Sequence, residues 1–91
     1  MKIGMTDVLI DTDTRLRCWV NEDHELVEAS SPQYGDASIT TISNEYQVGL
    51  VDPCGNRLTI QLGRWLDPVT LRYKLVLRWA IKEEYNADQL S

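Results

Sequence analysis

The sequence predicts a mainly β protein: a single small antiparallel sheet or half-open barrel of five to six strands, in one domain spanning residues 1–91. Apolar and other side chains alternate through residues 71–82, and again through residues 46–51 and 57–62 on either side of a turn that contains Pro and Gly. The chain is 43% hydrophobic, which supports one core and argues against intrinsic disorder.

Residues 8–10 form a short apolar run that is typical of a buried strand, and residues 11–14 favour a turn because Asp and Thr side chains bond to nearby backbone groups. Residues 15–20 alternate, with Cys18 on the apolar face and Trp19 on the polar face. The polar residues 21–24 are of hairpin length, and residues 25–29 are the expected returning strand.

Residues 30–36 are predicted to be a loop because they concentrate Ser, Pro, Gly and Asp. Residues 37–44 are β-favouring without clean alternation. Residues 46–82 are expected to form a three-stranded meander, with a turn over residues 52–56 in which Pro53 presets φ and Gly55 or Asn56 supplies a positive φ.

Strict alternation from residue 58 onward would bury Arg64 and expose Trp65. We therefore expect a bulge at Gly63, which would return Trp65 to the apolar face. The chain is expected to end with a short helical turn or frayed tail over residues 83–90, possible anchors being Tyr85 and Leu90.

Residues 71–82 form the clearest strand, because an advance of about 100° per residue would scatter their apolar side chains round a helix. The predicted apolar face holds Leu71, Tyr73, Leu75, Leu77, Trp79 and Ile81. The other face holds a basic stripe: Arg72, Lys74, Arg78 and Lys82. Asp67 followed by Pro68 is also how a helix begins, so a helix remains the alternative.

The net charge of −5 is distributed unevenly along the chain. Residues 1–53 hold ten acids and three bases, residues 54–82 hold one acid and six bases, and residues 83–91 add three acids. The acidic excess argues against generic nucleic-acid binding and against anionic membranes, which both select for Lys and Arg. No apolar run is long enough to span a bilayer, and no secretory signal is recognisable, so a cytoplasmic location is expected. Cys18 and Cys54 are then expected to be reduced thiols.

Catalytic motifs are scarce in this sequence. His24 is the only histidine and lies in a polar turn between acids, where a solvated residue is the simpler interpretation. No closely spaced Cys or His pair suggests zinc, and no Gly-rich phosphate loop is present. Residues 11–13 resemble half of a calcium loop, but Arg15 replaces an oxygen ligand, so a turn is favoured. We expect neither enzymatic activity nor a cofactor or metal.

Two charged surfaces are the candidate partner-binding sites, together with Trp19, which is a typical interface anchor when exposed. One is the basic stripe. The other is the acidic hairpin, which is made of Glu22, Asp23, Glu25 and Glu28. Both have simpler explanations, because acids at turns keep small proteins soluble and the bases can pair with acids of residues 1–53.

The sequence favours a non-enzymatic acidic protein, a monomer or small homo-oligomer, that inhibits or modulates a larger nucleic-acid-handling complex through its charged surface. Phages and mobile elements use small acidic proteins in this way against host defences such as CRISPR systems. The first alternative is a phage or cellular assembly component whose sheet is completed by a neighbouring subunit. The second is an unrecognised enzyme or metal-binding protein.

Overall fold

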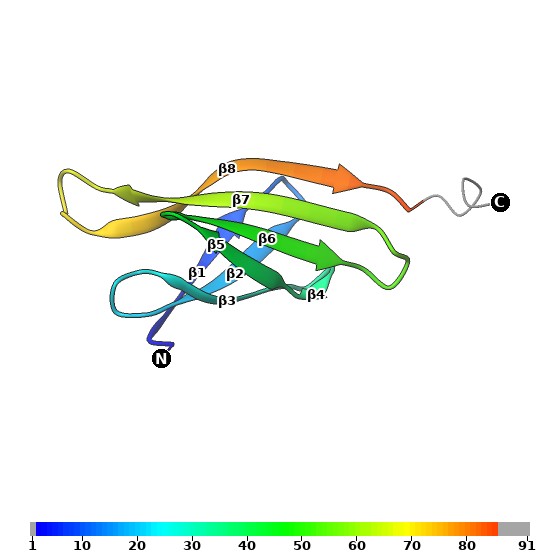
Figure 1. Ribbon diagram of the computed structural model, residues 1–91, viewed down its shortest axis with the longest axis horizontal. Coiled ribbons are helices and arrows are strands. Elements are labelled where there is room, and N and C mark those ends of the chain that lie inside the picture. Colours follow the sequence, from blue (N-terminus) through cyan, green and yellow to red (C-terminus); the bar gives the residue numbers. More distant parts are fainter. Residues whose placement is uncertain (1, 86–91) are drawn as a thin grey trace.

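The computed structural model describes residues 2–85, which form eight strands and no helix. The strands are β1 (Gly4–Leu9), β2 (Arg15–Val20), β3 (Leu26–Ser31), β4 (Gly35–Asp36), β5 (Ser38–Ile42), β6 (Glu45–Val51), β7 (Arg57–Leu66) and β8 (Tyr73–Glu83). They make two four-stranded antiparallel sheets, ordered β1-β2-β3-β4 and β5-β6-β7-β8 (Figure 1). The predicted β class and the meander β6-β7-β8 are confirmed.

The prediction of a single sheet with five or six strands is wrong, because the chain changes sheet in its middle. Residues 30–36, expected to be a loop, instead continue β3 to Ser31 and form β4 after a tight turn in which the Tyr34 N–H donates to the Ser31 carbonyl at 3.2 Å. One residue, Ala37, then separates β4 from β5 of the second sheet. The predicted C-terminal helical turn lies mostly outside the described residues, and Glu83 is the last residue of β8.

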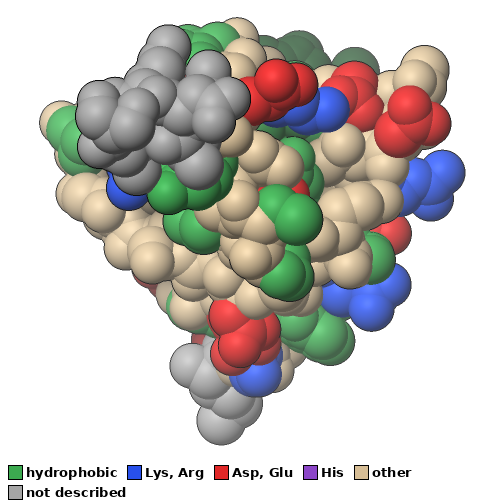
Figure 2. Space-filling model, turned by 90° about the vertical axis from the view of Figure 1, so that its right-hand side faces the viewer, with side chains coloured by type: hydrophobic (Ala, Val, Ile, Leu, Met, Phe, Trp, Pro, Cys, Tyr) green, Lys and Arg blue, Asp and Glu red, His purple; other side chains and the backbone are tan. Residues whose placement is uncertain are grey.

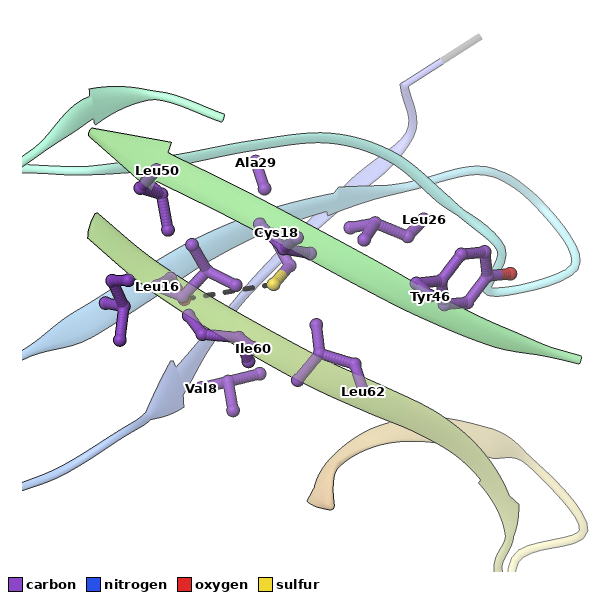
Figure 3. Close-up of a cluster of buried hydrophobic side chains, with 11 residues drawn as sticks. Val8, Leu16, Cys18, Leu26, Ala29, Tyr46, Leu50, Ile60 and Leu62 are labelled. Atoms are coloured by element: carbon purple, nitrogen blue, oxygen red, sulfur yellow. Dashed lines mark hydrogen bonds between the residues drawn. The ribbon is translucent and has the colours of Figure 1, made fainter. Parts of the chain in front are cut away.

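The core lies between the two sheets. Alternate side chains of β2 and β3 face those of β6 and β7, as the close-up in Figure 3 shows. The side chains with at most 2% of their surface exposed are Leu16, Cys18, Ala29, Val48, Leu50, Leu58, Ile60 and Leu62. Full burial of each leucine or isoleucine contributes about 1.5–3 kcal/mol. The predicted alternation of residues 15–20, 46–51 and 57–62 is therefore the pattern that builds the core.

Strand β8 does not alternate uniformly, because Arg78 has no partner on β7. Gln61 pairs with Trp79 and Leu62 pairs with Leu77, so a bulge on β8 reverses the two faces at this point. Before the bulge, Leu75 and Leu77 pack against the core. After it, Trp79 and Ile81 are 42% and 52% exposed. The predicted apolar face is therefore correct for Leu75 and Leu77 and wrong for Trp79 and Ile81. It is also wrong for Leu71, which lies in the turn before β8, and Tyr73 at the start of the strand is 42% exposed.

The bulge expected at Gly63 is instead on the neighbouring strand, at Arg78. Gly63 is buried because the Arg78 guanidinium covers it, and a Cβ at position 63 would lie only 2.9 Å from Arg78 Cζ. Strand β7 keeps its parity through Gly63, so Arg64 turns toward the inner side and Trp65 is 41% exposed. Glycine at position 63 thus makes room for a side chain of the adjacent strand.

Candidate functional site

Three turns lie together at one end of the molecule, on the left of Figure 1, and we call this the tip end: the β2–β3, β5–β6 and β7–β8 turns. The opposite end, which we call the glycine end, holds the β1–β2, β3–β4 and β6–β7 turns. The predicted acidic hairpin reaches the tip end. The candidate site is therefore built from the turns that gather there.

The β2–β3 turn carries Glu22, Asp23 and Glu25, which we call the acidic turn. Asn21 organises it: the Asn21 N–H donates to the Glu25 carbonyl at 3.1 Å, and Asn21 Oδ1 accepts from the backbone N–H groups of Asp23 and Glu25, each at 2.9 Å. Glu25 Oε1 accepts from Asn21 Nδ2 at 3.0 Å. The carboxylates of Glu22 and Asp23 are exposed and form no ion pair within residues 2–85. The turn thus holds uncompensated negative charge on a hydrogen-bonded frame.

The β7–β8 turn is organised by Asp67 in the same manner. The Asp67 N–H donates to the Arg72 carbonyl at 2.9 Å, the Leu71 N–H donates to the Asp67 carbonyl at 2.8 Å, and Asp67 Oδ1 accepts from the Val69 N–H at 2.8 Å. The pKa of the Asp67 carboxyl is lowered mainly by the Val69 N–H, with smaller contributions from the Thr70 N–H and the charge of Lys74. Lys74 Nζ lies 3.9 Å from Asp67 Oδ2 and 4.8 Å from the centroid of the Trp65 ring.

An open cleft of about 600 Å³ separates these two turns. Residues 22–25 form one wall, and the other residues that line it are Arg64, Leu71, Arg72 and Tyr73. Arg64 bridges the walls: its Nη2 donates to the Asp23 carbonyl at 2.7 Å, and its Cζ lies 4.2 Å from the centroid of the Tyr73 ring. Its buried Nε has no hydrogen-bond partner in the described part of the chain. The cleft therefore has a polar, mixed-charge lining.

A second, smaller cavity of about 290 Å³ adjoins the cleft, and both are lined by His24 and Tyr73. His24 was predicted to be a solvated turn residue. It does lie in the turn, but it is half-buried and has a φ of 59°, which is in the left-handed region. Its location between two cavities was not foreseen.

The basic stripe does not form one charged face, because the bulge at Arg78 divides it. Lys74 and Arg78 lie on the outer side of the sheet, whereas Lys82 pairs across from the core residue Leu58. Arg78 Nε is 3.3 Å from Glu45 Oε1, and Lys82 Nζ forms an ion pair with Asp11. Lys74 is paired with Asp67, so three of the four residues of the basic stripe form an ion pair within the chain. The fourth, Arg72, has no ion pair among the residues described.

Trp19 and Glu28 lie on the outer face of the first sheet. They are cross-strand neighbours, and Lys2 contacts both: Lys2 Nζ is 3.1 Å from Glu28 Oε2 and 5.4 Å from the centroid of the Trp19 ring. Trp19 is half-buried. Glu28 is thus paired, unlike Glu22 and Asp23 at the end of the same hairpin, so the four predicted acids are not equivalent.

The turn over residues 11–14 is a strand-end turn, as favoured. Asp11 Oδ1 accepts from the Asp13 and Thr14 N–H groups at 2.9 and 2.8 Å. Asp11 Oδ2 accepts from Lys82, which is the main reason that the pKa of Asp11 falls to about 2. Within residues 2–85, no group of three or more His, Cys, Asp or Glu side chains is arranged to hold a metal ion.

Comparisons with protein-family models, with curated proteins and with solved structures found no match to this chain. Over the described residues, there is also no helix with the length and apolar character needed to cross a membrane. The candidate site therefore depends on its own geometry. The sequence pointed to the acidic turn and Arg72, but not to Arg64, Leu71 or Tyr73 across the cleft. The sequence did contain one signal of the unusual backbone at His24. Asn21 stands three residues before His24, as Asp52 stands three residues before Gly55, and both third residues have a positive φ.

Proposed function

We propose that this chain is a non-enzymatic binding protein that modulates or inhibits a larger nucleic-acid-handling complex through the acidic turn. One observation carries the proposal. The acidic turn exposes Glu22 and Asp23 without any ion pair in the described residues, whereas three of the four members of the basic stripe are paired within the chain. Two acids of the acidic hairpin, Glu22 and Asp23, thus have no ion pair in the described residues, against one base of the basic stripe, Arg72, and this difference supports the acidic turn as the binding surface.

The chemistry of such a partner follows from this charge. Carboxylates held on a hydrogen-bonded turn resemble the phosphates of a nucleic-acid backbone in sign, so they complement a groove lined with Lys and Arg. Effector complexes that hold a nucleic acid in a positively charged channel, CRISPR effectors among them, offer a groove of this kind. The net charge of −5 favours rapid electrostatic encounter with it.

A capture experiment with charge-reversed variants tests this proposal. The tagged protein is used as bait in lysate of the cells in which it occurs, over a series of salt concentrations. We expect salt to weaken capture and the Glu22→Lys/Asp23→Lys variant to abolish it, since reversed charges repel a basic groove. Asp13→Lys/Asp36→Lys is the matched control, because it makes the same change in net charge at two exposed acids on the glycine-end side of the molecule. Salt-independent capture, equal capture by all variants, or no capture argues against the proposal.

A second candidate function is an assembly component, and it is favoured by a different observation. Strand β8 is an edge strand of eleven residues with Trp79 and Ile81 exposed on its outer side. Edge strands of this length can pair with a strand of a neighbouring subunit. The assembly hypothesis predicts rings or filaments in electron microscopy of the purified protein. A protein that sediments as a monomer at high concentration is incompatible with it.

A further inference from the structure

We propose that Leu71 is the apolar anchor of this interface, and that it seats in an apolar pocket of the partner that is ringed by basic side chains. The inference rests on the proposed function, which it extends from the acidic turn to the turn across the cleft. It names the partner surface by its chemistry: an apolar depression large enough for a leucine side chain, with Lys or Arg at its rim.

The first observation is a comparison of three turns that close in the same way. An Asn or Asp begins each turn, and its backbone N–H donates to the carbonyl of the last residue: Asn21 to Glu25, Asp52 to Asn56, and Asp67 to Arg72. In all three, the residue before the last has a positive φ. That residue is Gly55 in the β6–β7 turn, but His24 and Leu71 in the two turns at the tip end, with φ values of 59° and 57°.

The second observation is that folding gains little from a leucine at this position. A residue with a Cβ is strained at positive φ, because the Cβ approaches the carbonyl oxygen, and glycine avoids this strain. Burial does not offset the strain either, since Leu71 is 73% exposed. Strained residues that folding does not require are concentrated at functional sites, where the side chain serves another purpose.

The third observation is the surroundings of Leu71. Val69 in the same turn is 88% exposed and Leu66 at the end of β7 is 44% exposed, so Leu71 is not the only exposed apolar side chain of this hairpin. The acidic turn forms the other wall of the cleft that Leu71 lines, and there the acids outnumber the arginines three to two. An apolar group beside carboxylates is complementary to an apolar pocket beside bases. The same carboxylates disfavour an anionic membrane as the occupant.

Substitutions that separate strain from contact test the inference. Leu71→Asn removes the apolar side chain and introduces a residue that tolerates positive φ. Leu71→Met keeps both the apolar character and the strain. Val51→Thr is the control, because Val51 is an apolar side chain, 54% exposed, at the glycine end. Each purified variant is melted, and its dissociation constant is measured with the captured partner after identification by mass spectrometry and purification.

We expect Leu71→Asn to leave Tm unchanged or raise it by up to about 4 °C, because strain is relieved. The same variant should weaken binding at least about tenfold, as the loss of one buried leucine side chain implies. Leu71→Met and Val51→Thr should bind within about threefold of the parent protein. A fall in Tm for Leu71→Asn shows that the leucine serves folding and overturns the inference, as does binding that equals that of the parent.

The outcomes also separate this inference from the proposed function. If Glu22→Lys/Asp23→Lys abolishes binding while Leu71→Asn leaves it intact, the anchor is refuted and the acidic turn stands. If the parent protein captures nothing, both fail. Two further measurements test other occupants of the turn. Sedimentation with phosphatidylserine vesicles tests a membrane, and sedimentation velocity of the protein alone tests a second copy of the chain. Loss of vesicle binding or of self-association in Leu71→Asn assigns the turn to a membrane or a second copy instead, and overturns the inference.

Discussion

The two ends of the molecule have different residue types at the turn positions with a positive φ. At the glycine end, the residues with positive φ are Gly35 and Gly55, for which this conformation is unstrained. At the tip end, the described residues with positive φ are His24, Ser43 and Leu71, none of them a glycine. Seen face-on in Figure 2, the glycine end shows acidic and basic side chains interspersed. The contrast teaches that the turns of the glycine end avoid backbone strain, whereas the turns of the tip end accept this strain and carry side chains at the strained positions.

The largest effect is expected in strand β8, which runs from the tip end to the glycine end. Leu77→Asp should destabilise the protein by about 3 kcal/mol or more, because a carboxylate would replace an apolar side chain packed against the core. Trp79→Asp, beyond the bulge, should cost about 1 kcal/mol or less. Urea unfolding followed by circular dichroism measures both. Equal losses would show that the bulge at Arg78 does not reverse the faces.

The glycine end can be strained deliberately by alanine at either of its positive-φ positions. Gly35→Ala should cost about 1 kcal/mol, because a Cβ there meets no atom within 4 Å and only backbone strain is added. Gly55→Ala should cost about 2 kcal/mol, since its Cβ would also lie 3.0 Å from the Tyr85 ring. The same unfolding assay compares them. If Gly55→Ala is no worse than Gly35→Ala, the contact with Tyr85 is not part of the fold in solution.

The glycine end should also respond to acid through Asp11. Its pKa is about 2 in the folded protein against an ordinary value of 3.8, so the unfolded chain takes up this proton first as the pH falls. The stability contributed by the ion pair with Lys82 is therefore complete above pH 3.8 and lost as the pH falls to about 2. Asp11→Asn should flatten the pH dependence of Tm in this window. An unchanged pH dependence of Tm in Asp11→Asn would contradict this prediction.

The smallest effect concerns the two thiols, which differ in accessibility and in acidity. Cys54 is exposed in the β6–β7 turn and should react with a thiol reagent at once, whereas Cys18 is buried and should react only after unfolding. Burial, with a smaller contribution from Asp7, raises the pKa of Cys18 from 9.0 to about 12. The unfolded chain therefore loses this proton first, and stability should fall as the pH rises above 9.0. Counting of reactive thiols in the folded and unfolded protein checks the difference in reactivity. Melting curves at alkaline pH check the loss of stability.

The sequence was informative wherever one period governed a whole strand. Residues 46–51 and 57–62 alternate without interruption, and the structure places Val48, Leu50 and Ile60 in the core. Alternation mispredicted which side chains of β8 face the core, because the position of a bulge depends on the residues of the neighbouring strand. Gly63 leaves a space on β7 that the Arg78 guanidinium fills, and this contact joins residues of different strands that no local pattern relates.

The candidate site was also predictable only where neighbouring residues in the sequence define it. The acids of the acidic turn are visible as a cluster in the sequence, and they are exposed as expected. Leu71 was assigned to the apolar face of a strand, because its residue type fits the alternation of residues 71–82. The structure instead places it in the turn before β8 with a positive φ. Which leucine is core and which is exposed was decided by where the turn closed, through the hydrogen bonds of Asp67.

The location of Cys54 has a practical consequence. It is an exposed thiol at the end of the molecule opposite the acidic turn, and the second cysteine is shielded. A maleimide resin or dye therefore couples through a defined point without engineering. Immobilised in this orientation, every copy presents the acidic turn and Leu71 outward to solution, so a sensor surface made from the unmodified sequence displays the candidate interface uniformly.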